Sequence, residues 1–237
     1  MSFDMKLEMR DISIEFPGVK ALSNVNFSTS SGTVHAIVGA NGAGKSTLMK
    51  VLGGVETTWT GEILINGERV NIRSPQDAKA LGIEVVYQEV DMALALNMSV
   101  AENIMLSSTI THSKGNPLMR WRHIKRVAKQ TLARMGLEID VNKKARSISL
   151  AQRQMVLIAR AIVEECRILV LDEPTAPLST KETEELFRIV RELTEKHGIA
   201  VIFISLNCLK FVRTSPLCGM GEWCTKASWQ SWKFRRL

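Results

Sequence analysis

The sequence lacks any apolar run long enough to cross a membrane. Its longest runs, "ILVL" at 168–171 and "IAVIFI" at 199–204, are far shorter than the about 20 residues that a spanning helix needs. The opening stretch, "MSFDMKLEMRD", mixes acids and bases and has no apolar segment of the kind found in a secretory signal. The sequence therefore predicts a cytosolic chain, which leaves open a peripheral position on a membrane protein.

Cysteine, tryptophan and excess basic charge are scarce before residue 206. Residues 206–237 contain three of the four Cys, three of the five Trp, and six Lys or Arg against one Asp or Glu, a net charge of +5. Because the whole chain carries +7, residues 1–205 carry only +2. This near-neutral body argues against a nucleic-acid partner.

Short apolar runs alternate with helical patterns, which predicts an α/β fold with a largely parallel sheet. Three helices are expected: one that starts within 44–47 and continues through 54, one at 150–163, and one that follows a capping box of Ser179 and Glu182 and stops at Gly198. The expected strands are 34–38, 62–65, 83–87, 168–171 and 200–204.

The segment between 87 and 150 has mostly helical character. Its basic stretch at 116–130, "NPLMRWRHIKRVAKQ", fits either a phosphate-contacting surface or a solvated helix face, and the second interpretation is favoured. The chain shows no internal repeat and one phosphate-binding loop.

That loop is "GANGAGKST" at 39–47, which fits G-x-x-x-x-G-K-[ST] between an expected strand and an expected helix. The glycines allow backbone N–H groups to wrap a phosphate, and the helix N-terminus adds a positive dipole. Lys45 should reach the β- and γ-phosphates, Ser46 should bind Mg²⁺, and Thr47 can add a phosphate contact.

A second pattern, "ILVLDEPTAPLS" at 168–179, places two carboxylates at the end of a buried strand. Ligand sites of open parallel sheets lie at such ends. Asp172 suits Mg²⁺, directly or through water, and Glu173 suits a group that orients the water attacking the γ-phosphate.

Three weaker features gain meaning from their order along the chain. Gln88 ends a strand and could touch Mg²⁺ or the attacking water. Ser149, in "SISLAQRQ", precedes a helix and suits an N-cap or a phosphate contact. Phe16 precedes a Pro-Gly turn and suits adenine stacking or the core.

Taken together, these motifs resemble the ATP-binding cassette of ABC transporters over about residues 5–205. The phrases "FPGVKALSNVNF", "GANGAGKSTLMKVLGG", "LGIEVVYQEV", "NMSVAENI", "SLAQRQMVLIARAI" and "LVLDEPTAPLS" are most similar to the first cassette of tandem ATPases from bacterial monosaccharide importers. The resemblance implies a P-loop NTPase fold with an N-terminal antiparallel β part, a mostly parallel core sheet and a helical subdomain at about 95–165.

The resemblance also implies an ATPase that uses ATP and Mg²⁺. Its implied partners are integral-membrane permease subunits, a second cassette and, indirectly, a periplasmic sugar-binding protein, at the inner face of the cell membrane. Glu173 and Gln88 would be catalytic, and Ser46, Gln88 and Asp172 would hold the metal. Nucleotide contacts would come from Phe16, Gly39, Ala40, Asn41, Gly42, Ala43, Gly44, Lys45, Ser46, Thr47, Ser149 and Gln152.

Two departures from the family pattern stand out. In the signature loop at 149–152, Leu150 and Ala151 replace two glycines, and their side chains obstruct a close approach to phosphate. The productive site is therefore expected to pair this P-loop with the signature loop of a second cassette. Leu206 stands where the family has a histidine that contacts the γ-phosphate.

The region from Leu206 onward is expected to be an out-of-frame, disordered tail. A synonymous coding sequence for 206–221, read after insertion of one nucleotide, gives the family-like His-Lys-Leu-Ser-Glu-Ile-Cys-Glu-Asn-Ile-Thr-Val-Met-Arg-Asn-Gly. A metal module built on Cys208, Cys218 and Cys224, or an amphipathic membrane anchor, are the alternatives. The expected result is a cassette with weak or absent hydrolysis; a catalytically dead binding module and a soluble ABC-type ATPase of DNA repair or translation are the other functions kept open.

Overall fold

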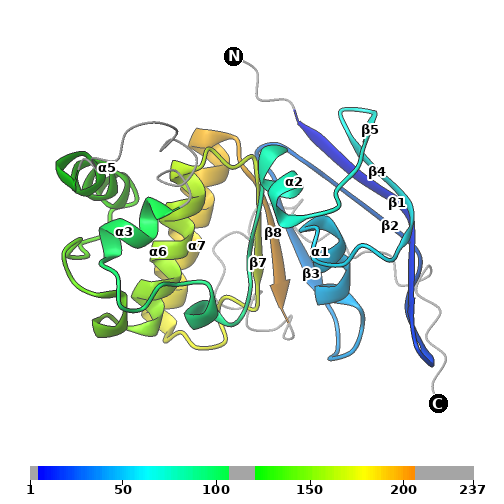
Figure 1. Ribbon diagram of the computed structural model, residues 1–237, viewed down its shortest axis with the longest axis horizontal. Helices are drawn as coiled ribbons and strands as arrows, with labels where there is room; N and C mark the ends of the chain where they lie inside the picture. Colours follow the sequence, from blue (N-terminus) through cyan, green and yellow to red (C-terminus); the bar gives the residue numbers. More distant parts are fainter. Residues whose placement is uncertain (1–4, 107–120, 206–237) are drawn as a thin grey trace.

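The computed structural model describes residues 5–106 and 121–205, and within them two four-stranded sheets lie beside a set of helices (Figure 1). One sheet is antiparallel and has the strand order β2-β1-β4-β5. The other is parallel and has the order β3-β8-β7-β6. The α/β fold class predicted from the sequence is confirmed.

The parallel sheet contains β3 (Val34–Val38), β6 (Ile83–Val86), β7 (Ile168–Asp172) and β8 (Ala200–Ser205). Every residue of β7 and β8 is buried, because both faces of these central strands are covered. Continuous apolar runs such as "ILVL" are the expected sequence of such strands.

The antiparallel sheet contains β1 (Lys6–Phe16), β2 (Val19–Ser30), β4 (Thr60–Ile65) and β5 (Glu68–Val70). The stretch at 62–65 was expected to be a strand and is one, within this sheet. In β1 the buried residues Met9 and Ile12 are three positions apart, because Asp11 takes a left-handed conformation (φ 52°) where the register shifts. This bulge restores the buried face, but it interrupts the alternation by which a strand is found in a sequence.

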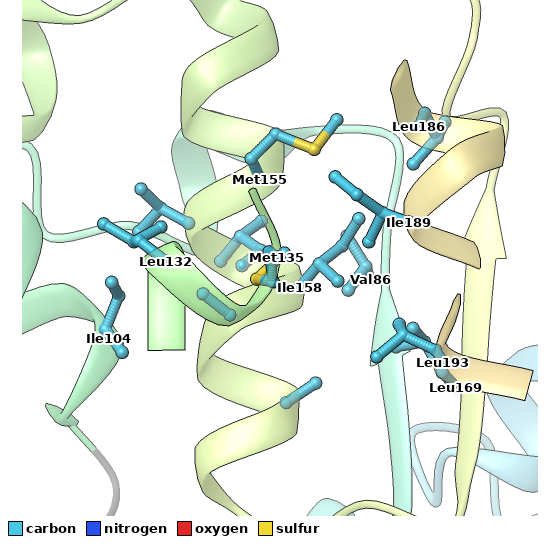
Figure 2. Packing of buried hydrophobic residues seen from close by; sticks show 14 of the residues in the cluster. Val86, Ile104, Leu132, Met135, Met155, Ile158, Leu169, Leu186, Ile189 and Leu193 are labelled. Atoms are coloured by element: carbon cyan, nitrogen blue, oxygen red, sulfur yellow. The ribbon is translucent and has the colours of Figure 1, made fainter. Parts of the chain in front are cut away.

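Two hydrophobic cores cover the two faces of the parallel sheet. One contains Ile168, Val170 and Ile202 together with the inner face of the antiparallel sheet and α1 (Lys45–Leu52). The other contains Leu169 and Phe203 together with the remaining long helices. Figure 2 shows α6 at the centre of this second core, between α3 and α5 on one side and α7 with the sheet on the other.

The three helices predicted from periodicity are present. α6 (Leu150–Val163) matches its expected bounds, and α7 (Thr180–His197) has the Ser179–Glu182 capping box and ends at Gly198 in the left-handed region. α1 ends at Leu52, two residues before the expected limit, because the chain turns at Gly53 and Gly54. Gly54 is in the left-handed region, with a φ of +69°.

Within the described residues between 87 and 150, the helical elements are η1 (Val90–Met92), α3 (Val100–Ile104), α5 (Trp121–Arg134) and η2 (Ala145–Ser147). A short helix, α2 (Pro75–Ala80), precedes them. Within the described part of the basic stretch, α5 exposes Arg122, Lys125, Arg126 and Lys129, which agrees with a solvated helix face.

Residues 206–237 lie outside the described part of the chain, and so do the expected tail, its cysteines and Leu206. Within the described residues, no helix is long and apolar enough to span a membrane.

Candidate functional site: a nucleotide-binding edge of the parallel sheet

The carboxyl ends of all four parallel strands meet at one edge of the sheet. Val38 pairs with Ser205, Asp172 with Ile204, and Val86 with Leu171. The glycine-rich loop therefore leaves this edge from β3, the two acidic residues leave it from β7, and Gln88 leaves it from β6. Parallel sheets bind ligands at such an edge.

The glycine-rich loop at 39–47 turns from β3 into α1. Gly42 and Gly44 have φ values of +77° and +80°, which residues with a side chain rarely adopt. Gly44 is the N-cap of α1, and no side chain accepts a hydrogen bond from the first turn of the helix. Backbone N–H groups at this N-terminus are therefore available to an anion such as phosphate.

Lys45, the first residue of α1, lies inside this loop. Its side chain is 7% exposed, and Nζ donates hydrogen bonds to the carbonyl oxygens of Gly39 (2.7 Å) and Ala40 (2.9 Å). The loop thus surrounds an ammonium group, a point charge suited to phosphate.

Ser46 and Asp172, the two residues with the strongest sequence argument for Mg²⁺, lie together. The hydroxyl Oγ of Ser46 donates to Oδ1 of Asp172 at 3.4 Å, although the residues are 126 positions apart. Since Mg²⁺ binds oxygen ligands at about 2.1 Å, two oxygens at this separation can share one ion. Both are hard oxygen ligands, so the pair fits the expected metal.

Burial raises the pKa of Asp172, whereas the Ser46 hydroxyl and the nearby Lys45 ammonium act to lower it. Because burial is the larger effect, the buried carboxylate of Asp172 is disfavoured relative to its protonated form, and a bound cation would stabilise it.

Glu173 follows directly after β7 and takes a left-handed backbone conformation, with φ 49°. Its N–H donates to the carbonyl of Ile204 at 3.1 Å, which ties the turn to β8. A non-glycine residue held in this region costs free energy, and such strain gathers at functional sites. This conformation is consistent with a role for Glu173 beside the metal pair.

Gln88 is exposed and lies just beyond the end of β6. The last pair of the β6–β7 register is Val86 with Leu171, so Gln88 and Glu173 both stand two residues past it. Gln88 is thus on the same edge as the carboxylates.

Phe16 is the last residue of β1, at the hairpin that joins it to β2, and its side chain is 37% exposed. The antiparallel sheet that contains β1 shares a core with α1, the helix that follows the glycine-rich loop. Adenine stacking on Phe16 stays a prediction.

Ser149 and Gln152 belong to the start of α6, not to the strands and the loop that form this edge. α6 packs on the face of the sheet opposite to α1 (Figure 1). Ser149 caps α6: its Oγ accepts from the N–H of Gln152 at 3.2 Å, while Oε1 of Gln152 accepts from the N–H of Ser149 at 3.2 Å. The structure does not bring these two residues to the P-loop of their own chain.

One buried charged residue of α6 was missed at the level of sequence. Arg160 is 8% exposed in α6, and its only signal is a lone charged side chain between apolar neighbours in "IARAI". Its contacts lead to the segment that follows Gln88.

The chain is similar in sequence to curated proteins named as ATP-binding proteins of ribose import. The chain is 46% identical to the ribose import ATP-binding protein RbsA 1 of Burkholderia cenocepacia over 205 residues. It is 45% identical to RbsA 2 of Escherichia coli O157:H7 over 199 residues. Each alignment covers 84% of this chain and 38% of the relative, so the chain spans well under half the length of the relatives it matches.

Solved structures agree in fold. The ADP conformation of MJ1267, an ATP-binding cassette of an ABC transporter, is 25% identical with a TM-score of 0.75, over 89% of this chain and 85% of the other. The dimeric bacterial ABC transporter cassette MJ0796 is 25% identical with a TM-score of 0.73, over 88% of this chain and 91% of the other.

The family model described as ABC transporter matches residues 22–176, a stretch that runs from β2 through the glycine-rich loop to just past Glu173. With the strand order and the edge geometry on which that loop lies, this match means that the chain belongs to the ABC transporter family.

Proposed function

We propose that this chain is the ATP-binding subunit of a sugar importer and that it binds MgATP at the edge formed by residues 39–47, Gln88, Asp172 and Glu173. The observation that carries the proposal is the contact between Ser46 and Asp172 beside the buried Lys45. The names of the ribose-import relatives support the sugar class.

Each residue has a separate task in this proposal. The loop N–H groups and the Lys45 ammonium bind the phosphates, and Ser46 and Asp172 hold Mg²⁺, which when bound neutralises charge on the phosphates. Gln88 orients the attacking water or completes the metal shell. Glu173 accepts a hydrogen bond from that water and so aligns it with the γ-phosphate.

The signature loop of this chain is proposed to be unproductive. Ser149 and Gln152 are engaged with each other, and Leu150 between them is 40% exposed. A second cassette would have to supply a competent loop to this P-loop, in tandem or as a dimer. Permease subunits, the inner face of the membrane and an indirect link to a periplasmic sugar-binding protein belong to the same proposal.

The same signature loop favours a second candidate function, an ATP-binding module without turnover. Two measurements separate the candidates: the affinity for a fluorescent ATP analogue and the release of phosphate from ATP. The importer proposal expects binding by the chain alone, with weak or no phosphate release, and release after a second cassette and the permease are added. Binding with no release in the full assembly supports the inactive module, and no binding at all contradicts both.

Residues 206–237 are proposed to be translated out of frame. The test is the nucleotide sequence from the Ser205 codon onward. A shifted frame that stays open and encodes a further cassette supports the proposal, whereas one that closes at once contradicts it.

A further inference from the structure

Arg160 carries a buried charge whose hydrogen-bond partners are mainly backbone carbonyls. Nε donates to the carbonyl of Asn103 at 2.7 Å, and Nη1 donates to the carbonyl of Ala93 at 3.0 Å. Burial lowers the pKa of Arg160, and the carboxylates of Glu164 and Glu84 oppose that effect. Burying a cation without hydrogen-bond partners is costly. Loss of these contacts would leave the guanidinium unsatisfied, so we expect them to hold the backbone at Asn103 and Ala93 in place.

Asn103, in α3, extends the same network and is fully buried. Its Oδ1 accepts from the N–H of Ala95 at 2.8 Å, and its Nδ2 donates to the carbonyls of Ala95 and Ser99, each at 3.0 Å. Nη2 of Arg160 lies 3.4 Å from the same Oδ1. Arg160 therefore ties the backbone at 93 to α6, and Asn103 ties the backbone at 95 and 99 to α3, which Arg160 in turn joins to α6.

The segment held in this way is the Gln88 loop, defined as residues 87–99. Consecutive turns connect Gln88 to Ala93: the N–H of Val90 donates to the carbonyl of Gln88 (3.0 Å), and the N–H of Ala93 donates to that of Val90 (3.2 Å). Because the connection is short and hydrogen-bonded, fixing Ala93 restricts where Gln88 can lie.

A second arginine of α6 touches the same loop more weakly. Arg153 is two helical turns before Arg160, on the same face, and its Nη1 lies 2.8 Å from Oδ1 of Asp91. The Asp91 side chain is 51% exposed, and exposed ion pairs contribute little. Replacement of Asp91 is therefore a matched control: it removes a contact between α6 and the Gln88 loop that should contribute little to the position of the loop.

We propose that Arg160, together with Asn103, is a positioning residue for Gln88. It fastens the Gln88 loop to α6 and so holds the Gln88 side chain at the carboxyl edge of the sheet, where MgATP is proposed to bind. This proposal rests on the proposed function, because it assumes that Gln88 serves a bound MgATP.

The first test is the ratio of ATP-analogue affinities measured in Mg²⁺ and in EDTA for the full chain. Gln88→Ala should reduce this ratio about three- to tenfold, which corresponds to the loss of one hydrogen bond of ordinary strength. Arg160→Met should reduce it by the same factor with the EDTA affinity unchanged, and the double variant should show no further loss. Asp91→Asn should retain the wild-type ratio.

A purely structural role for Arg160 predicts a different pattern. Affinity would then fall equally in Mg²⁺ and in EDTA, and the effects of Arg160→Met and Gln88→Ala would add; either result overturns the proposal. The proposal is also overturned if Gln88→Ala lowers the ratio of affinities in Mg²⁺ and EDTA while Arg160→Met leaves that ratio unchanged. Failure of the wild type to bind nucleotide would instead contradict the proposed function.

The second test does not depend on what Gln88 binds. Amide exchange of the Gln88 loop, read by mass spectrometry, should accelerate about tenfold or more in Arg160→Met at the N–H of Ala93, the residue whose carbonyl loses its contact with Arg160, with β7 and β8 unchanged. Arg160→Lys, which keeps the charge but cannot reach every acceptor, serves if Arg160→Met does not fold, and it should show a smaller acceleration. Equal exchange in the wild type and the variant overturns the positioning role.

Discussion

The N-termini of α1 and α6 both follow sequence motifs that suit a phosphate contact, but the structure caps them differently. α1 begins after Gly44 with no side-chain cap, beside a buried lysine. α6 begins after Ser149 with a closed capping box, followed by the exposed Leu150. Since a phosphate site needs free N–H groups and close backbone approach, α1 is prepared to receive an anion and α6 is not.

The difference also shows what the glycines do. In the α1 loop they supply left-handed backbone at 42 and 44, with φ of +77° and +80°. At the start of α6 ordinary side chains stand in place of glycines, and Ser149 accepts a hydrogen bond from the N–H of Gln152 in the first turn. One helix end is therefore built for a ligand and the other for stability.

The largest expected effect comes from Lys45→Ala. Removing an ammonium group held inside the loop should weaken binding of a fluorescent ATP analogue by about 100-fold or more, since hydrogen bonds to charged groups each contribute about 1.5–3 kcal/mol. A titration of the purified chain checks this. Unchanged binding would remove the glycine-rich loop from the site.

Ser46→Ala should affect only the magnesium-dependent part of binding. The expected change is a roughly tenfold loss of affinity in Mg²⁺ and none in EDTA, because the hydroxyl is proposed to act on the nucleotide through the ion. Thr47→Ala is the neighbouring control and should act equally in both conditions. A loss in EDTA that matches the loss in Mg²⁺ would show that Ser46 does not act through the metal.

Ser149→Ala should reduce stability without reducing nucleotide affinity. Loss of an N-cap costs about 1 kcal/mol, and Ser179→Ala, which removes the equivalent cap of α7, should cost about the same. Denaturant unfolding and the ATP-analogue titration measure the two quantities. A fall in affinity for Ser149→Ala alone would mean that α6 contacts the nucleotide of its own chain.

The smallest effect is expected from Asp172→Asn on the nucleotide-free chain. The folded pKa of Asp172 is raised, so the folded state binds the proton more tightly and stability falls as pH rises above the ordinary carboxyl value of 3.8. Asn lacks this charge, so the variant should melt slightly higher than the wild type at pH 7. The gain should vanish at pH values below 3.8; a lower melting temperature at pH 7 would contradict this reasoning.

The sequence was enough to predict most of the parallel sheet, because continuous apolar runs bounded by glycine or acidic residues specify buried strands. It also predicted α6 and α7, because Ser149 and Ser179 are recognisable N-caps and Gly198 is a recognisable C-cap of α7. The first two strands were not located by local pattern, since the bulge at Asp11 breaks the alternation.

The candidate site was predictable only in part. The glycine-rich loop and Asp172 could be paired in advance because both follow strands of one parallel sheet. The network of Arg160 and Asn103 could not, because it joins residues 57 positions apart through backbone carbonyls, which leave no mark in the sequence.

The most direct test of the account is photolabelling of the full chain with 8-azido-ATP in Mg²⁺, followed by mapping of the labelled peptide and competition with excess ATP. The account predicts a label that ATP displaces, on the peptide that contains Phe16, and none on the peptide at the start of α6. A displaceable label on residues 145–155 would contradict it, because the nucleotide would then lie at the helix end assigned to stability.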